Sequence, residues 1–171
     1  MIDSKPCKTK EYFNKYLYFK RVGAYMKVYD SNMLRNIAVL GHSGCGKTNL
    51  IEAIAYTSNL TNKISKQNDK VNMTYTLGLV LVEYNNYKYN LLDTPGYFDF
   101  CGEVISSLTA SDAAIIVIDA TTDIQVGTEK SLELTEDVPK IMFINKIDNE
   151  KSRYKDTVEI LREQYGNKIV T

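Results

Sequence analysis

The stretch from Gly41 to Thr48 constrains the fold of this chain more than any other. It reads GHSGCGKT and fits the phosphate-binding pattern G-x-x-x-x-G-K-[ST] at every fixed position. Residues 35–40 are mostly apolar, as in a short strand, and residues 49–55 space their apolar side chains as a helix does. A strand, a glycine-rich loop and a helix start place backbone N–H groups around a phosphate. The sequence therefore predicts a nucleotide phosphate site, and a chance glycine-rich turn is the alternative.

Each residue of this loop is a candidate phosphate ligand: Gly41, His42, Ser43, Gly44, Cys45, Gly46, Lys47 and Thr48. We expect Lys47 to reach the β- and γ-phosphates and the Thr48 hydroxyl to bind Mg²⁺. His42 is the only histidine, and we expect it to pack the loop rather than to catalyse. Cys45 is expected to fill a small loop position.

Composition is typical of a globular domain and excludes several classes of protein. The 171 residues suffice for one domain with a proper core. The formal net charge is zero, so nothing global indicates affinity for nucleic acid or membrane. No apolar run approaches the roughly 18–20 residues that span a bilayer. The N-terminus shows no secretory signal, and three scattered cysteines favour a reducing, cytoplasmic setting.

Residues 1–33 differ from the rest of the chain. They hold seven basic residues against three acidic ones, together with seven tyrosines and phenylalanines. A basic segment with interleaved aromatics can bind RNA or a membrane surface. We expect instead a loosely ordered or surface-packed extension, with the nucleotide-binding domain occupying residues 34–171.

Strand and helix patterns alternate after the phosphate loop. Apolar runs predict strands at residues 35–40, 76–84, 87–92, 113–119 and 140–144. Helical spacing occurs at residues 47–56, 101–109, 128–137 and 151–165. Asn85 and Asn86 predict a tight turn, residues 57–73 a polar loop, and residues 168–170 a further strand. This order predicts an α/β fold with a mostly parallel central sheet, helices on both faces, and ligands at the carboxyl ends of the strands.

A second motif, Asp93-Thr94-Pro95-Gly96, follows an expected strand. Asp93 can hold Mg²⁺, usually through a water, and Gly96 offers a bare backbone N–H to a γ-phosphate. Pro95 fixes the turn that contains Thr94. Alone, this tetrapeptide is a common turn sequence.

A third motif, Asn145-Lys146-Ile147-Asp148, follows the last expected strand. The Asp148 carboxylate can accept hydrogen bonds from two N–H groups of guanine, a pair that adenine lacks. Asn145 can tie the base to the phosphate loop, and the stem of Lys146 can lie over the ring. Three motifs in this order, each at a strand end, predict a guanine-nucleotide site.

The motifs resemble those of the translational GTPases, most closely elongation factor G and its elongation-factor-G-like paralogues. The residues that carry the resemblance are 35–48, 90–100, Glu103, Val104, Asp119, Ala120 and 145–148. The resemblance covers residues 34–171 and implies a P-loop NTPase fold, Mg²⁺-dependent hydrolysis of GTP to GDP and phosphate, and work on the ribosome. It also implies that Thr74 completes the Mg²⁺ shell, and that Gly96 and the residue after it belong to the catalytic machinery with Lys47.

The chain departs from that family at three places. Tyr97 stands where a histidine usually orients the attacking water, which predicts slow hydrolysis. Gly44 replaces a typical aspartate. The sequence stops before the last guanine-contacting strand, so the GTPase domain is expected to be C-terminally incomplete. Two alternatives stay open here: a nucleotide-binding module with little turnover, and the corresponding domain of a tetracycline-resistance-type ribosomal protection protein.

Overall fold

The computed structural model describes residues 28–58, 77–96 and 101–166. By its internal contacts the chain divides into two units, Met1–Asp30 and Ser31–Thr171. The expected extension, residues 1–33, lies mostly outside the described residues and stays a prediction. The expected loop 57–73 and the expected strand 168–170 also lie wholly or almost wholly outside them.

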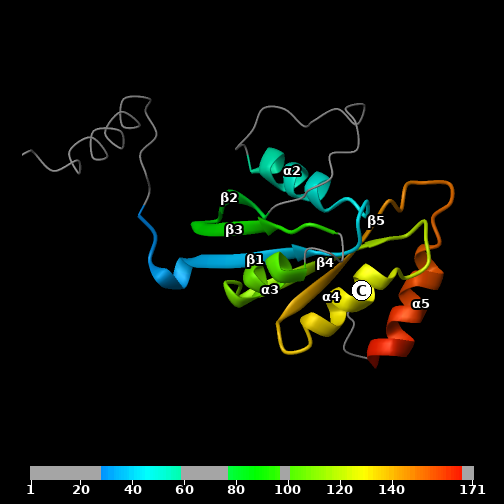
Figure 1. Cartoon of the computed structure of the whole chain (residues 1–171). Helices are drawn as coiled ribbons and strands as arrows, with labels where there is room; N and C mark the ends of the chain where they lie inside the picture. Colours follow the sequence, from blue (N-terminus) through cyan, green and yellow to red (C-terminus); the bar gives the residue numbers. More distant parts are fainter. Residues whose placement is uncertain (1–27, 59–76, 97–100, 167–171) are drawn as a thin grey trace, which may run out of the picture. The chain divides into compact units, whose positions relative to one another are not determined.

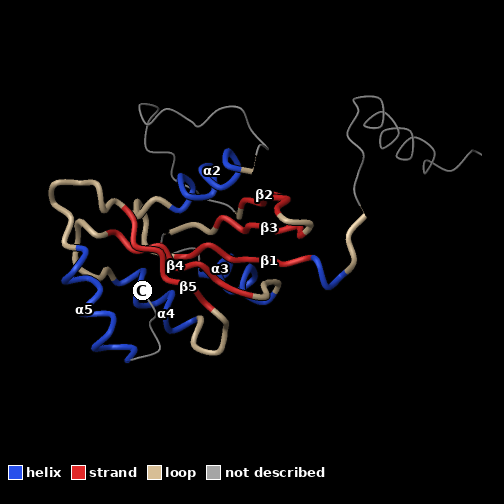
Figure 2. Tube along the Cα trace, turned by 180° about the vertical axis from the view of Figure 1, so that it is seen from behind, coloured by secondary structure: helices blue, strands red, loops and turns tan. Residues whose placement is uncertain are grey.

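Five strands form one sheet in the second unit (Figure 2). They are β1 (Leu34–Leu40), β2 (Gly78–Tyr84), β3 (Tyr87–Asp93), β4 (Ala113–Asp119) and β5 (Lys140–Asn145). Their order across the sheet is β2-β3-β1-β4-β5. The pairs β1–β3, β1–β4 and β4–β5 are parallel, whereas β2 and β3 are antiparallel. The mostly parallel α/β sheet expected from the sequence is confirmed.

The antiparallel pair depends on two asparagines. Asn85 and Asn86 have φ angles of 48° and 66°, the left-handed pair that a tight hairpin turn requires and that asparagine tolerates. The hairpin places Gly78 opposite Asp93. The turn predicted from the sequence is confirmed.

A short 3₁₀-helix, η2 (Ser31–Met33), precedes β1 in the described residues. Four α-helices follow there, three of them between strands and the last after β5. They are α2 (Lys47–Thr57), α3 (Cys101–Thr109), α4 (Val126–Leu134) and α5 (Tyr154–Tyr165). No helix in the described ranges is long and apolar enough to cross a membrane.

Two helix boundaries differ from the sequence prediction by three residues. Helix α4 ends at Leu134, before the expected residue 137, and the hydroxyl of the next residue, Thr135, donates to the Ser131 carbonyl at 2.7 Å. Helix α5 starts at Tyr154 instead of residue 151. The backbone N–H of Arg153 donates to the Ala120 carbonyl at 2.7 Å, which holds the preceding turn against the end of β4 and delays the helix.

Helices cover both faces of the sheet, as Figure 1 shows. Helix α2 lies on one face, where Ile51 packs with Val39 and Val117. Helices α3, α4 and α5 lie on the other face, where a second cluster buries Leu40, Ile116, Val104, Leu132 and Leu161. Alternate residues of the central strands therefore point into two cores, which fixes the register of the sheet.

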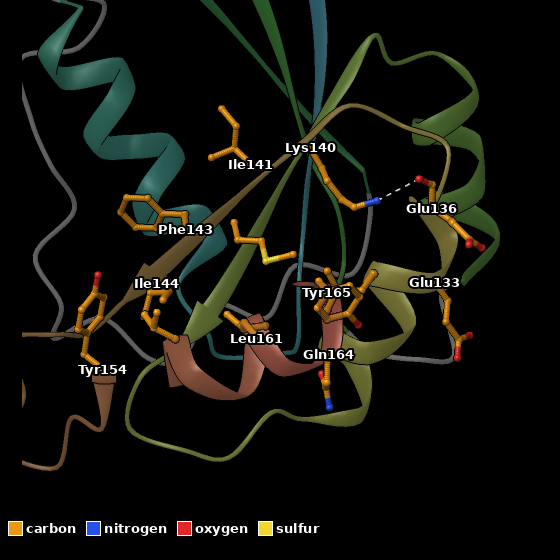
Figure 3. A pocket seen from close by; sticks show the side chains of 13 residues that line it. Glu133, Glu136, Lys140, Ile141, Phe143, Ile144, Tyr154, Leu161, Gln164 and Tyr165 are labelled. Carbon is orange, nitrogen blue, oxygen red and sulfur yellow. Dashed lines mark hydrogen bonds between the residues drawn. The ribbon is translucent and has the colours of Figure 1, made fainter. Parts of the chain in front are cut away.

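Strand β5 forms one edge of the sheet. Met142 and Ile144 pack against the α3–α5 core, whereas the alternate residues Ile141 and Phe143 are 68% and 40% exposed. A hollow of about 1000 Å³ runs between β5, α4 and α5 (Figure 3). Residues 41–48, 93–96 and 145–148 do not line this hollow, so it is separate from the sequence-predicted nucleotide site.

Candidate functional site

The phosphate loop connects the end of β1 to the start of α2. Gly41, Gly44 and Gly46 have φ angles of 136°, 78° and 99°, a backbone region that residues with a Cβ rarely adopt. Space is also restricted, because a Cβ on Gly41 would lie 2.3 Å from the Val117 carbonyl oxygen. The three glycines therefore let the loop turn tightly against β4 and lead directly into the helix.

The Lys47 side chain folds back across this loop. Its Nζ donates to the carbonyl oxygens of Gly41 and His42, each at 2.9 Å, and only 6% of the residue is exposed. Burial lowers the pKa of Lys47, an effect partly offset by Cys45 and Asp93. An anion held by the loop would compete with the two carbonyls for the N–H groups of the Lys47 ammonium. Its negative charge would also stabilise the charged form of Lys47, which burial disfavours.

Thr48 and Asp93 come from separate elements and meet beside Lys47. The Thr48 hydroxyl donates to Oδ2 of Asp93 at 2.8 Å. Burial raises the pKa of the Asp93 carboxyl, against the Thr48 hydrogen bond and the Lys47 charge. Its other oxygen, Oδ1, is buried and has no hydrogen-bond partner among the described residues.

This pair fits a magnesium ion. A hydroxyl oxygen next to a carboxylate with an orphaned buried oxygen is a donor set suited to Mg²⁺, which takes one or two protein oxygens and completes its shell with phosphate and water. The described residues contain no group of three or more His, Cys, Asp or Glu side chains able to hold a metal.

The rest of the second motif lies against the phosphate loop. The Thr94 hydroxyl donates to the Val39 carbonyl at 2.7 Å, so Thr94 anchors the end of β3 to β1. Pro95 is buried. A Cβ on Gly96 would lie 2.4 Å from Nζ of Lys47 and 2.7 Å from the Ser43 nitrogen, so only glycine lets the backbone approach so closely. The two remaining expected site residues, Thr74 and Tyr97, lie outside the described residues.

The third motif is tied to the phosphate loop by two side chains. Nδ2 of Asn145 donates to the Cys45 carbonyl at 2.9 Å, and Nζ of Lys146 donates to the Gly44 carbonyl at 2.8 Å. Lys146 has a φ angle of 60°, an unusual value for a residue other than glycine. Asp148 is exposed in the turn that follows β5. The structure thus brings the expected base motif and phosphate motif together.

One residue to which the sequence analysis assigns no role belongs to this cluster. Asp119 ends β4, and its Oδ2 accepts a hydrogen bond from Lys146 Nζ at 2.5 Å. The available sequence signal was a carboxylate at the end of the expected strand 113–119. The contact of Asp119 with Lys146 depends on β4 and β5 being neighbouring strands, with Asp119 opposite Asn145.

His42 and Cys45 pack within the loop. A Cβ on Gly127 would lie 2.7 Å from Nδ1 of His42, so the imidazole lies against the first turn of α4. Burial, followed by the Lys47 charge, lowers the pKa of His42. Cys45 is 1% exposed, and burial raises the pKa of its thiol above the usual value. Both residues are therefore neutral packing groups at neutral pH.

Comparison with known proteins agrees with this geometry. Residues 32–171 match the family described as "Elongation factor Tu GTP binding domain". A mitochondrial ribosome-releasing factor 2 from Vanderwaltozyma polyspora is 32% identical over 88% of this chain and 20% of its own length. An elongation factor G-like protein from Thermotoga maritima is 30% identical over 80% of this chain and 21% of its own length. The chain therefore spans about a fifth of the length of these relatives.

Solved structures show the same fold. A protein of Thermus thermophilus superposes with a TM-score of 0.71 at 30% identity, over 78% of this chain and 22% of that one. Translation elongation factor SelB from Methanococcus maripaludis, solved with the GTP analogue GppNHp, has a TM-score of 0.63 at 24% identity, over 82% of this chain and 27% of its own. With its fold, its strand-end motifs and the family match in agreement, this chain belongs to the elongation factor Tu GTP-binding domain family.

Proposed function

We propose that residues 34–171 bind GTP and GDP with Mg²⁺ and hydrolyse GTP to GDP and phosphate, as the GTPase domain of an elongation-factor-G-like protein that acts on the ribosome. One observation carries the proposal: side chains from the ends of two strands, β3 and β5, converge on the loop that follows β1. Thr48 meets Asp93 at 2.8 Å, and Asn145 meets the Cys45 carbonyl at 2.9 Å. Convergence at the carboxyl ends of parallel strands is typical of nucleotide sites in α/β folds.

Base selection is assigned to Asp148. Its exposed carboxylate accepts hydrogen bonds from the imino and exocyclic amino groups of guanine, whereas adenine offers no matching pair of donors. The stem of Lys146 lies over the ring, and Asn145 holds the base site in register with the phosphate loop.

Phosphate binding is assigned to the loop 41–48. Its backbone N–H groups and the start of α2 surround the phosphates, and Lys47 transfers its hydrogen bonds from two carbonyls to phosphate oxygens. Thr48 and Asp93 would hold Mg²⁺, with Thr74 as the further ligand expected from the family resemblance. When bound, the ion would supply positive charge that stabilises the phosphate oxygens.

Hydrolysis is assigned to Lys47 and Gly96, with Tyr97 as the residue beside the attacking water. The Gly96 backbone lies against Ser43 and Lys47, so its N–H can donate to the γ-phosphate when the nucleotide is bound. Lys47 and the backbone N–H groups stabilise the charge that develops during phosphoryl transfer. Because a tyrosine cannot act as the usual histidine does, we propose that hydrolysis by the isolated domain is slow.

The ribosome is the proposed partner, because the relatives carry the names elongation factor G-like protein and ribosome-releasing factor 2. Those names do not favour a ribosomal protection protein. We place the protein in the cytoplasm on the basis of its scattered cysteines. Some relatives are named as mitochondrial, so cell fractionation tests this placement.

Single-turnover hydrolysis of radiolabelled GTP, with and without ribosomes, tests the proposed function. We expect slow phosphate release that ribosomes accelerate and that Tyr97→His accelerates in the isolated domain. Tyr154→His is the matched control, because Tyr154 is a 43% exposed tyrosine on α5 and lies outside the three motifs. GTP binding without turnover under every condition would identify a nucleotide-binding module instead.

A further inference from the structure

We infer that Asp119 is a positioning residue of the base site: it holds the Lys146 side chain across the phosphate loop and thereby sets how long a guanine nucleotide stays bound. The inference rests on the proposed function, because it concerns the same site. It adds a residue from β4, a strand to which the proposed function assigns no role.

Lys146 is held at both ends. Its backbone, with φ at 60°, directly follows β5. Its Nζ donates to the Gly44 carbonyl at 2.8 Å and to Oδ2 of Asp119 at 2.5 Å. The aliphatic stem therefore extends from the end of β5 to the phosphate loop. A base bound at the third motif would pack against this stem.

Asp119 is itself fixed in place. It is 8% exposed, and its second oxygen, Oδ1, accepts from the Thr121 N–H at 2.9 Å and from the Thr121 hydroxyl at 2.6 Å. Both carboxylate oxygens are thus engaged. The next N–H in the chain, that of Ala120, donates to the Asn145 carbonyl at 3.0 Å, which joins the ends of β4 and β5 beside the pair.

The carboxylate is charged at neutral pH. Burial alone would raise the pKa of Asp119, but hydrogen bonds from Lys146 and Thr121 and the Lys146 charge hold it below its usual value. A charge-assisted hydrogen bond is stronger than a neutral one. Lys146 has a flexible stem, so fixing its head group removes rotamer freedom before the nucleotide arrives.

Loss of this anchor leaves Lys146 with the Gly44 carbonyl, on a side chain that is already 37% exposed. The stem then covers the base for a smaller part of the time. We expect Asp119→Asn to accelerate dissociation of GDP and GTP about tenfold, from the strength of a hydrogen bond between charged groups. Association should change little, because such effects appear mainly in dissociation.

Dissociation of fluorescent GDP, chased by excess unlabelled GDP in the presence of Mg²⁺, tests the inference. Asp112→Asn is the matched control. Asp112 immediately precedes the opposite end of β4, and its Oδ2 accepts from the Asn36 N–H at 2.7 Å. Its substitution perturbs the same strand without altering Lys146, so we expect wild-type dissociation from this variant.

A double-mutant cycle separates positioning from general destabilisation. Lys146→Met keeps a stem of similar length and removes the head group, so adding Asp119→Asn to it should cause no further acceleration. Thr121→Val removes the hydroxyl that holds Oδ1 and should accelerate dissociation two- to threefold. This milder variant tests the inference if Asp119→Asn fails to fold.

The outcomes distinguish failure of the inference from failure of the proposed function. If the wild-type chain binds no guanine nucleotide, the proposed function fails and the inference with it. If the wild type binds but Asp119→Asn and Thr121→Val release GDP at the wild-type rate, the inference alone is overturned. Equal acceleration in Asp112→Asn, or additive effects in the cycle, would also overturn it.

Discussion

At the residue scale, Lys47 shows most directly how the site is prepared for an anion. A buried ammonium whose pKa is lowered by burial gains when a negative group replaces the neutral carbonyls around it. The two hydrogen bonds to Gly41 and His42 hold the side chain within the loop until that happens.

Lys47→Ala is therefore predicted to weaken GTP and GDP binding by about 100-fold, since each charge-assisted hydrogen bond is worth about 1.5–3 kcal/mol. Lys155→Ala is the control, because Lys155 is exposed on α5 and lies outside the three motifs. Equilibrium titration with fluorescent nucleotides measures both. Unchanged affinity in Lys47→Ala would show that the phosphate loop does not bind the nucleotide.

The ion pair of Asp119 with Lys146 predicts a pH-dependent stability. The pKa of Asp119 is lower in the folded chain than its unfolded value of about 3.9. The stabilisation is therefore fully present above that unfolded value and is lost as the pH falls through the folded pKa.

We predict that wild type is more stable than Asp119→Asn at pH 7 and that this difference closes as the pH falls below about 4. Urea unfolding of both nucleotide-free proteins at pH 7, 5 and 3 measures it. A stability difference that stays constant across this range would show that the charge of Asp119 contributes nothing.

Some residues of the site can be identified from the local sequence alone, and others only from the fold. The sequence predicts the spacing of the loop glycines and the places of Lys47 and Thr48 in the phosphate loop, because eight consecutive residues encode the geometry of this loop. The role of Asp119 was not predictable, because its partner Lys146 follows another strand and the contact depends on strand order and register. Thr94 likewise anchors β3 to β1, a contact that requires the fold.

At the element scale, Asn36 joins three segments at the amino end of β1. Its Nδ2 donates to the Ala110 carbonyl at 2.8 Å, and its Oδ1 accepts from Asn90 on β3 at 2.7 Å. Its side chain thereby links β1 to the neighbouring strand and to the turn after α3. This connection lies at the end of the strand away from the phosphate loop.

Asn36→Ala should lower the free energy of unfolding by about 2 kcal/mol, since two hydrogen bonds are lost, one to the exposed Ala110 carbonyl and one from the part-buried Asn90 amide. Nucleotide dissociation should remain at the wild-type rate. Arg35→Ala is the control, because Arg35 is exposed and its guanidinium donates to the adjacent Leu34 carbonyl. Denaturant unfolding tests this prediction, and equal stability of the two variants would contradict it.

Elements were predicted more accurately than their boundaries. The apolar runs identified the five strands of the described residues. Strand β4 is the buried, continuously hydrophobic strand that is typical of a parallel sheet. The end of α4 and the start of α5 were wrong by about three residues. The Arg153 N–H bonds to Ala120 across the fold, and helical periodicity carries no information about such a contact.

At the scale of the whole molecule, β5 is an edge strand that pairs only with β4 among the described strands. It presents backbone hydrogen-bonding groups beside exposed Ile141 and Phe143, as Figure 3 shows for the side chains. The sequence predicts a further strand at residues 168–170, and the open edge of β5 supports that proposal. An exposed apolar edge strand also favours association between chains.

Ile141→Lys is predicted to reduce self-association of this chain at high concentration without weakening nucleotide binding, because a charge on an edge strand opposes pairing. Val126→Lys is the matched control for Ile141→Lys, because Val126 and Ile141 are each 68% exposed and Val126 lies on α4 instead of the sheet edge. Sedimentation velocity measures the effect. Equal behaviour of the two variants would show that the β5 edge is not where chains meet.

The central claim, a guanine-nucleotide site, is tested most directly by titrating the purified chain with fluorescent GTP, GDP and ATP analogues, with and without Mg²⁺. We predict binding that is selective for guanine and strengthened by Mg²⁺. Asp148→Asn should lose guanine selectivity and bind xanthosine nucleotides better, because its amide donates to the xanthine carbonyl that replaces the guanine amine. Equal binding of ATP and GTP, or no binding of either, would contradict the account.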